Sequence, residues 1–221
     1  MTGVAETFWE KGNLTRMGIY ITTLEMDFLS SSLDETKNKD ILDIGAGAGR
    51  FSIPLSEKGM RATSLDLDSH SLKRLKFKNG NVNVIQSDAR VIPLKGDAMD
   101  MIVTVELVDV VHELNLVMEE IERILKPNGC LVFSFGNKSS FKGKLKSWRG
   151  TPYYHSYREV VNSLEKRGFT IVKRKGFNWL PFNRTSNSRL VPFMAKVERL
   201  FGLRKVVRYS PWVILYAVKS K

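Results

Sequence analysis

The stretch that decides the fold is ILDIGAGAGR, residues 41–50, in which glycines at three alternate positions follow an apolar run. The apolar run predicts a buried strand. Gly45, Gly47 and Gly49 have no Cβ, so the backbone there can turn sharply and approach a ligand closely. The helix expected next would offer unpaired N–H groups to that ligand. The pattern therefore indicates a ligand-binding loop between a strand and a helix.

The spacing of these glycines argues against a nicotinamide dinucleotide. The fingerprint for such a cofactor is G-x-G-x-x-G, but Arg50 stands at its third glycine position and Gly49 comes one residue early. In addition, Asp43 lies two residues before the first glycine, where its carboxylate would repel a pyrophosphate. The motif therefore points away from NAD.

Strand and helix patterns alternate around this loop. Residues 17–33 predict a helix that leads into a core domain starting at Asp40. The elements predicted beyond the loop are a helix ending near residue 59, strands at 62–66, 82–86, 99–105 and 130–136, helices at 68–77, 114–126 and 156–167, and final strands at 169–175 and 212–218. Such alternation indicates a parallel sheet with right-handed crossovers.

The loop with its preceding Asp43 resembles motif I of the class I S-adenosylmethionine-dependent methyltransferases, and the resemblance extends over about residues 40–137. Two further acids lie where the next two strands end, Asp66 in SLDLD and Asp88 in QSDAR. The resemblance implies an α/β fold with a doubly wound, mostly parallel seven-stranded sheet in the order 3-2-1-4-5-7-6. The last strand would be antiparallel, and helices would flank both faces. S-adenosylmethionine is the implied cofactor.

The resemblance also implies a role for each matching residue. Asp43 would hold the methionine end of the cofactor, directly or through water, and the glycine loop would wrap around it. Asp66 would accept hydrogen bonds from both ribose hydroxyls, Asp88 would contact the adenine amino group, and Leu67 would pack on the adenine face. The complete set of expected cofactor-binding residues is Asp43, Gly45, Ala46, Gly47, Gly49, Asp66, Leu67, Asp88, Ala89 and Glu106. Taken alone, Asp66 or Asp88 could equally be a helix cap.

No catalytic residue is assigned from the sequence. Methyl transfer depends on alignment of the acceptor, and an oxygen or carbon acceptor also needs a base within hydrogen-bond reach. The candidates near the substrate side are His112, Tyr153, Tyr154 and His155. For each of them a structural role is the simpler interpretation. Two more acids, Asp109 and Glu113, are expected to be surface or capping residues.

The charge of the chain is unevenly distributed. The net charge is +12, but residues 1–137 carry 15 basic and 20 acidic side chains, whereas residues 138–221 carry 20 basic and 3 acidic ones. The last third therefore carries +17 and is expected to face nucleic acid, a phospholipid surface or a phosphorylated substrate, with a solubilising surface as the simpler alternative. We divide the single domain, 1–221, into a helical lead-in at 1–39, a cofactor-binding core at 40–137 and a basic substrate-side part at 138–221.

The basic part contains an insertion, residues 176–211, with a predicted amphipathic helix. Pro192 fits the first turn of this helix and Gly202 can end it. Its expected apolar face consists of Phe193, Met194, Val197, Leu200 and Phe201, with Lys196 and Arg199 directed elsewhere. Such a helix could cap the acceptor pocket, lie on a membrane surface or pack on the sheet.

Three functions from different classes remain. The first is an S-adenosylmethionine-dependent methyltransferase acting on a small-molecule or lipid-linked acceptor, with an anionic membrane surface as a further partner. RNA methylation ranks second because no RNA-recognition module is found, and binding of the cofactor or a nucleotide without turnover is third. Cys130 and three scattered histidines give no disulfide and no metal-ligand spacing. Without a signal-peptide pattern or a long apolar run, we expect a cytoplasmic protein that could attach peripherally to a membrane.

Overall fold

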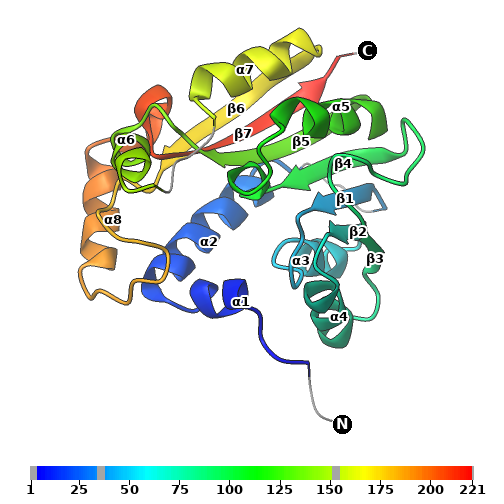
Figure 1. Ribbon diagram of the computed structural model, residues 1–221, viewed down its shortest axis with the longest axis horizontal. Helices are drawn as coiled ribbons and strands as arrows, with labels where there is room; N and C mark the ends of the chain where they lie inside the picture. The colour runs from blue at the N-terminus through cyan, green and yellow to red at the C-terminus, as the bar shows by residue number, and fades with distance from the viewer. Residues whose placement is uncertain (1–3, 34–37, 151–154, 221) are drawn as a thin grey trace.

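The computed structural model describes residues 4–33, 38–150 and 155–220. At its centre lies one seven-stranded sheet in the order β3-β2-β1-β4-β5-β7-β6 (Figure 1). Neighbouring strands among β1 to β5 pair in parallel, and β7 runs antiparallel to both β5 and β6. The strands are β1 (Asp40–Ile44), β2 (Arg61–Asp66), β3 (Asn83–Gln86), β4 (Met99–Thr104), β5 (Leu125–Gly136), β6 (Phe169–Phe177) and β7 (Trp212–Lys219). The predicted fold class is confirmed.

Helices cover both faces of this sheet. The helices packed on one face are α5 (Leu114–Ile124) and α7 (Tyr157–Lys166), and those on the other are α2 (Arg16–Ser30), α3 (Ser52–Glu57) and α8 (Val191–Leu200). The strand β1 shows why both faces need cover, because Ile41 points into one core and Leu42 and Ile44 point into the other. The helix α4 (Ser69–Lys78) packs against β2 and β3. The apolar runs seen in the sequence are thus strands buried on both sides.

Two helices lie outside the sequence predictions, α1 (Phe8–Asn13) and α6 (Phe141–Trp148). Thr7 and Glu10 form a capping box at the start of α1, and Ser140 caps α6 by accepting the Gly143 N–H. Both helices are short and expose large apolar side chains. Because neither presents an apolar face to the core, hydrophobic periodicity does not reveal them.

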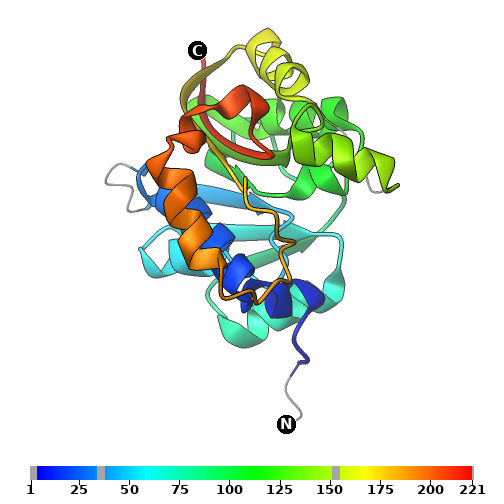
Figure 2. The same cartoon turned by 90° about the vertical axis from the view of Figure 1, so that its left-hand side faces the viewer.

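The helix α8 was predicted as an element, and the structure shows which of its side chains are buried. Val191 and Glu198 are buried, whereas Phe193, Leu200 and Phe201 are exposed. Glu198 turns inward because it accepts hydrogen bonds from the Tyr20 hydroxyl of α2 and from two other groups of the insertion. Figures 1 and 2 place α8 beside α2, at the side toward which β4 points. Within the described ranges, no helix is both long enough and apolar enough to cross a membrane.

Candidate active site

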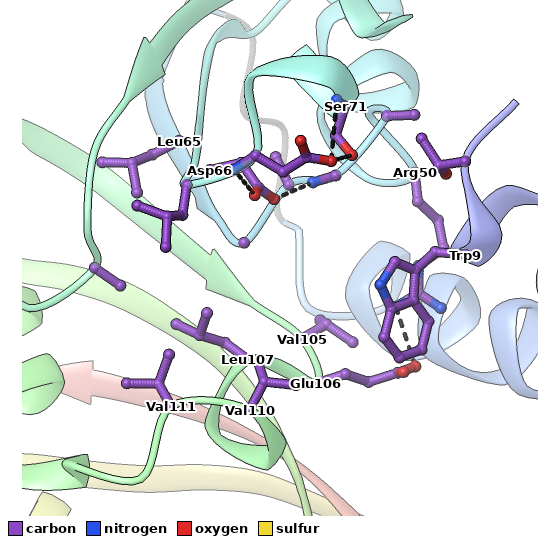
Figure 3. A pocket seen from close by; sticks show the side chains of 18 of the residues that line it. Trp9, Arg50, Leu65, Asp66, Ser71, Val105, Glu106, Leu107, Val110 and Val111 are labelled. Carbon is purple, nitrogen blue, oxygen red and sulfur yellow. Dashed lines mark hydrogen bonds and ion pairs between the residues drawn. The ribbon is translucent and has the colours of Figure 1, made fainter. Parts of the chain in front are cut away.

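A cavity of about 670 Å³ lies where the strands β1, β2 and β4 end, next to the glycine loop. In Figure 3, Asp66 lies on one side of this space, and Val110 and Val111 lie on the opposite side. Carboxyl ends of neighbouring parallel strands are where open α/β sheets bind ligands. The cavity therefore occupies the position that the glycine motif predicted.

Two glycines of the loop shape one wall of the cavity. Gly45 (φ +75°) donates its N–H to the Leu65 carbonyl at 2.8 Å, and Gly47 (φ +53°) donates to Asp66 Oδ2 at 2.7 Å. A Cβ added at Gly47 would meet no atom within 4 Å, so the backbone there borders open space. Gly49 (φ +85°) differs, because a Cβ would clash with Ile53 at 2.8 Å. Gly47 thus gives a ligand close access, whereas Gly45 lets the Leu107 side chain pack against the loop and Gly49 allows α3 to pack.

Asp66 and Asp88 both line the cavity. Asp66 accepts the N–H groups of Gly47 and Asp68, at 2.7 and 2.9 Å, one on each oxygen. Asp88 is paired with Arg90 at 2.6 Å. A carboxylate offers about four acceptor sites, so Asp66 keeps acceptor capacity for a ligand after binding these two amides. The structure brings both predicted acids to one cavity.

The apolar residues beside these acids are also accessible to a ligand. Leu67 is 67% exposed although it lines the cavity, and Ala89 lies beside Asp88 in the same lining. An exposed leucine at the rim of a concave site is a surface on which a flat aromatic ligand can stack. The predicted adenine-facing residues therefore lie together.

Asp43 is not among the residues that line the cavity. It is 2% exposed, and its Oδ2 accepts the Ser52 N–H at 3.1 Å. Burial raises the pKa of Asp43 to about 7, although the Ser52 hydrogen bonds and the charge of Arg50 oppose this shift. Asp43 thus ties the end of β1 to the first turn of α3, on either side of the glycine loop in the chain. Contact between Asp43 and the cofactor, directly or through water, stays a prediction.

A network of side chains with alternating charges borders the cavity. Among its members, only Glu106 was expected from the sequence to bind the cofactor. Arg50 pairs with Glu25 at 2.9 Å and with Glu106 at 3.2 Å, and Arg184 pairs with Glu106 from the other side. Burial opposes ionisation of Glu106, but the two guanidinium groups more than offset it and lower its pKa. Burial also raises the pKa of Glu25 above its usual range. Arg50, Glu106 and Arg184 line the cavity and offer both signs of charge to a ligand.

The roof of the cavity combines the N-terminal helices with the insertion. Trp9 and Leu14 line the cavity from α1 and the residue that follows it. The Met17 N–H donates to the Ser186 carbonyl at 3.1 Å, and Arg184 donates to Asn13 Oδ1 at 2.7 Å. Residues about 170 positions apart in the chain are thus joined over the site. A capping box at Thr7 was the one local signal for this part of the roof.

Of the candidate catalytic residues that the structure describes, neither His112 nor His155 lines the cavity. His112 is exposed and is absent from the cavity lining, and Tyr153 and Tyr154 lie outside the described residues. His155 pairs with Asn137 in an isolated bridge. The expectation of a surface role for Asp109 is wrong, because the Gly136 N–H donates to its carboxylate at 3.0 Å and burial raises its pKa to about 7. Glu113 lies at the rim and pairs with Arg90 at 3.1 Å.

Among the described residues, no group of His, Cys, Asp or Glu side chains is arranged to hold a metal ion. The sheet order and the antiparallel last strand are those of the Rossmann-like methyltransferase fold. Residues 42–133 match the family model described as a methyltransferase domain. Residues 42–133 therefore form a methyltransferase domain, for which S-adenosylmethionine is the cofactor.

Known proteins share this domain at low identity. The chain is 25% identical over 178 residues to a ubiquinone biosynthesis O-methyltransferase of Bartonella tribocorum, over 71% of this chain and 70% of that protein. It is 24% identical over 173 residues to the sterol 4-C-methyltransferase strm-1 of Caenorhabditis elegans, over 71% of this chain but only 52% of that protein. A solved S-adenosylmethionine-dependent methyltransferase of Listeria monocytogenes, described as putative in its title, superposes with a TM-score of 0.69 at 17% identity, over 91% of this chain and 99% of that one. This likeness shows the fold.

Proposed function

We propose that the protein transfers a methyl group from S-adenosylmethionine to a small-molecule or lipid-linked acceptor. The observation that carries the proposal is a single cavity that combines an open glycine loop, two acids at strand ends and a zwitterionic charge network. When bound, the cofactor supplies a methyl group on a positively charged sulfur. Two of the relatives are named as a ubiquinone biosynthesis O-methyltransferase and a sterol 4-C-methyltransferase, which supports a small or lipid-like acceptor.

The residues present fit the nucleoside part of this cofactor. Asp66 would accept hydrogen bonds from the ribose hydroxyls, because its carboxylate faces the cavity with acceptor sites to spare. Leu67 and Ala89 would contact the faces of the adenine ring, and Asp88 would accept from its amino group. Asp43 would act through the glycine loop that it anchors.

The charge network fits the methionine part. An amino acid end carries one carboxylate and one ammonium, and the cavity offers guanidinium groups and a carboxylate at one end, from Arg50, Arg184 and Glu106. Arg50 or Arg184 would bind the carboxylate, and Glu106 would bind the ammonium. The ion pairs of the network would then exchange partners, so that no buried charge is left alone.

The rim of the cavity favours an apolar acceptor. Trp9, Leu14 and Val110 line the cavity and are 51%, 68% and 61% exposed. The roof made by α1 and the insertion would exclude water from the acceptor once it is bound, which strengthens electrostatic interactions inside. We keep the division into lead-in 1–39, core 40–137 and substrate-side part 138–221 as part of this proposal, because the insertion in the last part supplies Arg184.

RNA methylation is the second candidate, favoured by the 20 basic and 3 acidic side chains of residues 138–221. An anionic membrane surface would draw on the same charges and would make the protein peripheral to a membrane. Binding of the cofactor without turnover is the third candidate. These possibilities give different results in one experiment.

The experiment incubates the protein with methyl-labelled S-adenosylmethionine and, separately, with a total lipid and small-molecule extract or total RNA from the source organism. We expect label in the extract, and less label with an Asp66→Ala variant at a limiting concentration of the cofactor, because its cofactor binding is weakened. Label in RNA alone would overturn the proposed acceptor. Cofactor binding without transfer to either preparation would support the non-catalytic alternative.

A further inference from the structure

We propose that α6 and α8 together form a platform that docks the protein on the surface of an anionic lipid bilayer. The platform consists of the exposed apolar side chains of Phe141 and Trp148 from α6 and of Phe193, Leu200 and Phe201 from α8. The platform differs in two ways from the apolar face expected from the sequence. It includes α6, and it leaves out the residues of α8 that face the protein.

The helix α6 turns an aromatic stripe to solvent. Phe141 and Trp148 are 76% and 82% exposed, and they lie seven residues apart, which puts them on the same face of a helix. Lys144 lies between them and is exposed as well. The opposite face is fixed to the protein, because Gly143 is buried and Lys142 Nζ donates to Asn178 Oδ1 at 2.8 Å. The orientation of the stripe is therefore set by contacts of the inner face.

The helix α8 repeats this arrangement. Phe193 and Leu200 are 62% and 82% exposed and again lie seven residues apart, and Phe201 is 71% exposed. The inner face is held by the buried Glu198, whose Oε1 accepts from Arg204 at 3.0 Å. A basic amphipathic helix with aromatic residues on its apolar side is typical of segments that lie in the bilayer interface.

The two helices lie on the same side of the molecule. Figures 1 and 2 place α6 and α8 at the side where β4 ends, and Lys142 of α6 is bonded to the segment that leads to α8. The cavity lies next to the strand ends at this side, with Trp9 and Leu14 at its rim. A bilayer bound by the platform would therefore lie near the entrance of the cavity.

The positive charge on this side of the molecule favours an anionic bilayer as the partner. The platform helices carry the exposed cations Lys144, Lys196 and Arg199. Glu198 is the only acid in the sequence of α6 and α8, and it is buried in an ion pair. Aromatic side chains flanked by cations match the headgroup region of an anionic bilayer. A second copy of the chain fits poorly, because each copy carries a net charge of +12.

The docking itself is independent of methyl transfer. One consequence does rest on the proposed function, namely that the acceptor is an amphiphile dissolved in the bilayer, which would reach the cavity without passing through water. Transfer of such a molecule from the membrane to an apolar rim avoids exposure of its apolar surface.

The test is co-sedimentation of the full chain with vesicles of phosphatidylcholine alone and of phosphatidylcholine mixed with phosphatidylglycerol. We expect binding to the mixed vesicles only. The pair Phe141→Ser with Phe193→Ser should weaken binding about tenfold or more for each aromatic side chain lost, at low and at high salt. The pair Lys144→Gln with Lys196→Gln should weaken it about fivefold per cation, at low salt only.

The matched control is Phe77→Ser, which removes a phenylalanine that is 61% exposed on α4, away from the platform. This variant should bind vesicles like the parent. Circular dichroism verifies that every variant is folded. Calorimetry with S-adenosylmethionine tests cofactor binding separately, so failure of cofactor binding would count against the proposed function and not against the platform. The proposal is overturned if the parent does not bind anionic vesicles, if the aromatic pair binds like the parent, or if RNA binds tightly while vesicles do not.

Discussion

Replacing Asp43 with asparagine should change how the stability of the protein depends on pH. Burial raises the pKa of Asp43 from its ordinary value of 3.8 to about 7. A carboxyl with a raised pKa holds its proton more tightly in the folded state, so its contribution to stability is complete below its unfolded pKa and is lost as the pH rises through the folded pKa. A difference of about three pKa units at ~1.4 kcal/mol each corresponds to a loss of up to about 4 kcal/mol.

Asparagine cannot ionise, but its side-chain oxygen can still accept the Ser52 N–H that Asp43 accepts at 3.1 Å. The free energy of unfolding of Asp43→Asn minus that of the parent should therefore increase by up to about 4 kcal/mol between about pH 4 and about pH 8. Urea unfolding followed by circular dichroism measures this difference. A flat difference for Asp43→Asn would refute the reasoning.

Two further predictions concern the loop and the roof. In urea unfolding, Gly49→Ala should lower the free energy of unfolding by about 2 kcal/mol more than Gly202→Ala does. Both glycines have positive φ, but only at Gly49 would a Cβ clash with Ile53. Equal losses in the two variants would contradict this explanation. Arg184→Ala should lower the free energy of unfolding by about 3 kcal/mol in the same assay and should speed hydrogen exchange at the Met17 amide. The variant leaves Glu106 with one partner and loses the hydrogen bond to Asn13. Unchanged exchange would show that the roof does not depend on this arginine.

The sheet and the glycine loop could be predicted because their signals are local. Apolar runs of strand length fixed β1 to β5, and the residues at their ends, such as Asp66 and Asp88, followed from the strand positions. Parallel strands bring their carboxyl ends to one edge, so these acids had to lie close together. The lining of the cavity by both acids follows from this topology.

The roof and the charge network could not be predicted in the same way. Arg184 and Glu106 are 78 residues apart, and Arg184 and Asn13 are 171 apart. No local pattern connects such positions. The burial of Glu198 in α8 could not be predicted for a related reason, since its inward turn depends on Tyr20 and Arg204, which lie on other elements. Buried polar partners decide orientations that hydrophobic periodicity cannot.

Binding of S-adenosylmethionine in the cavity is tested most directly by isothermal titration calorimetry. S-adenosylmethionine and S-adenosylhomocysteine should both bind to the parent protein, while NADH gives no heat of binding. Asp66→Ala should weaken both by about 1–3 kcal/mol, because buried ribose hydroxyls would lose a charged acceptor. Binding of NADH, or undiminished affinity for S-adenosylmethionine in a folded Asp66→Ala variant, would contradict the account.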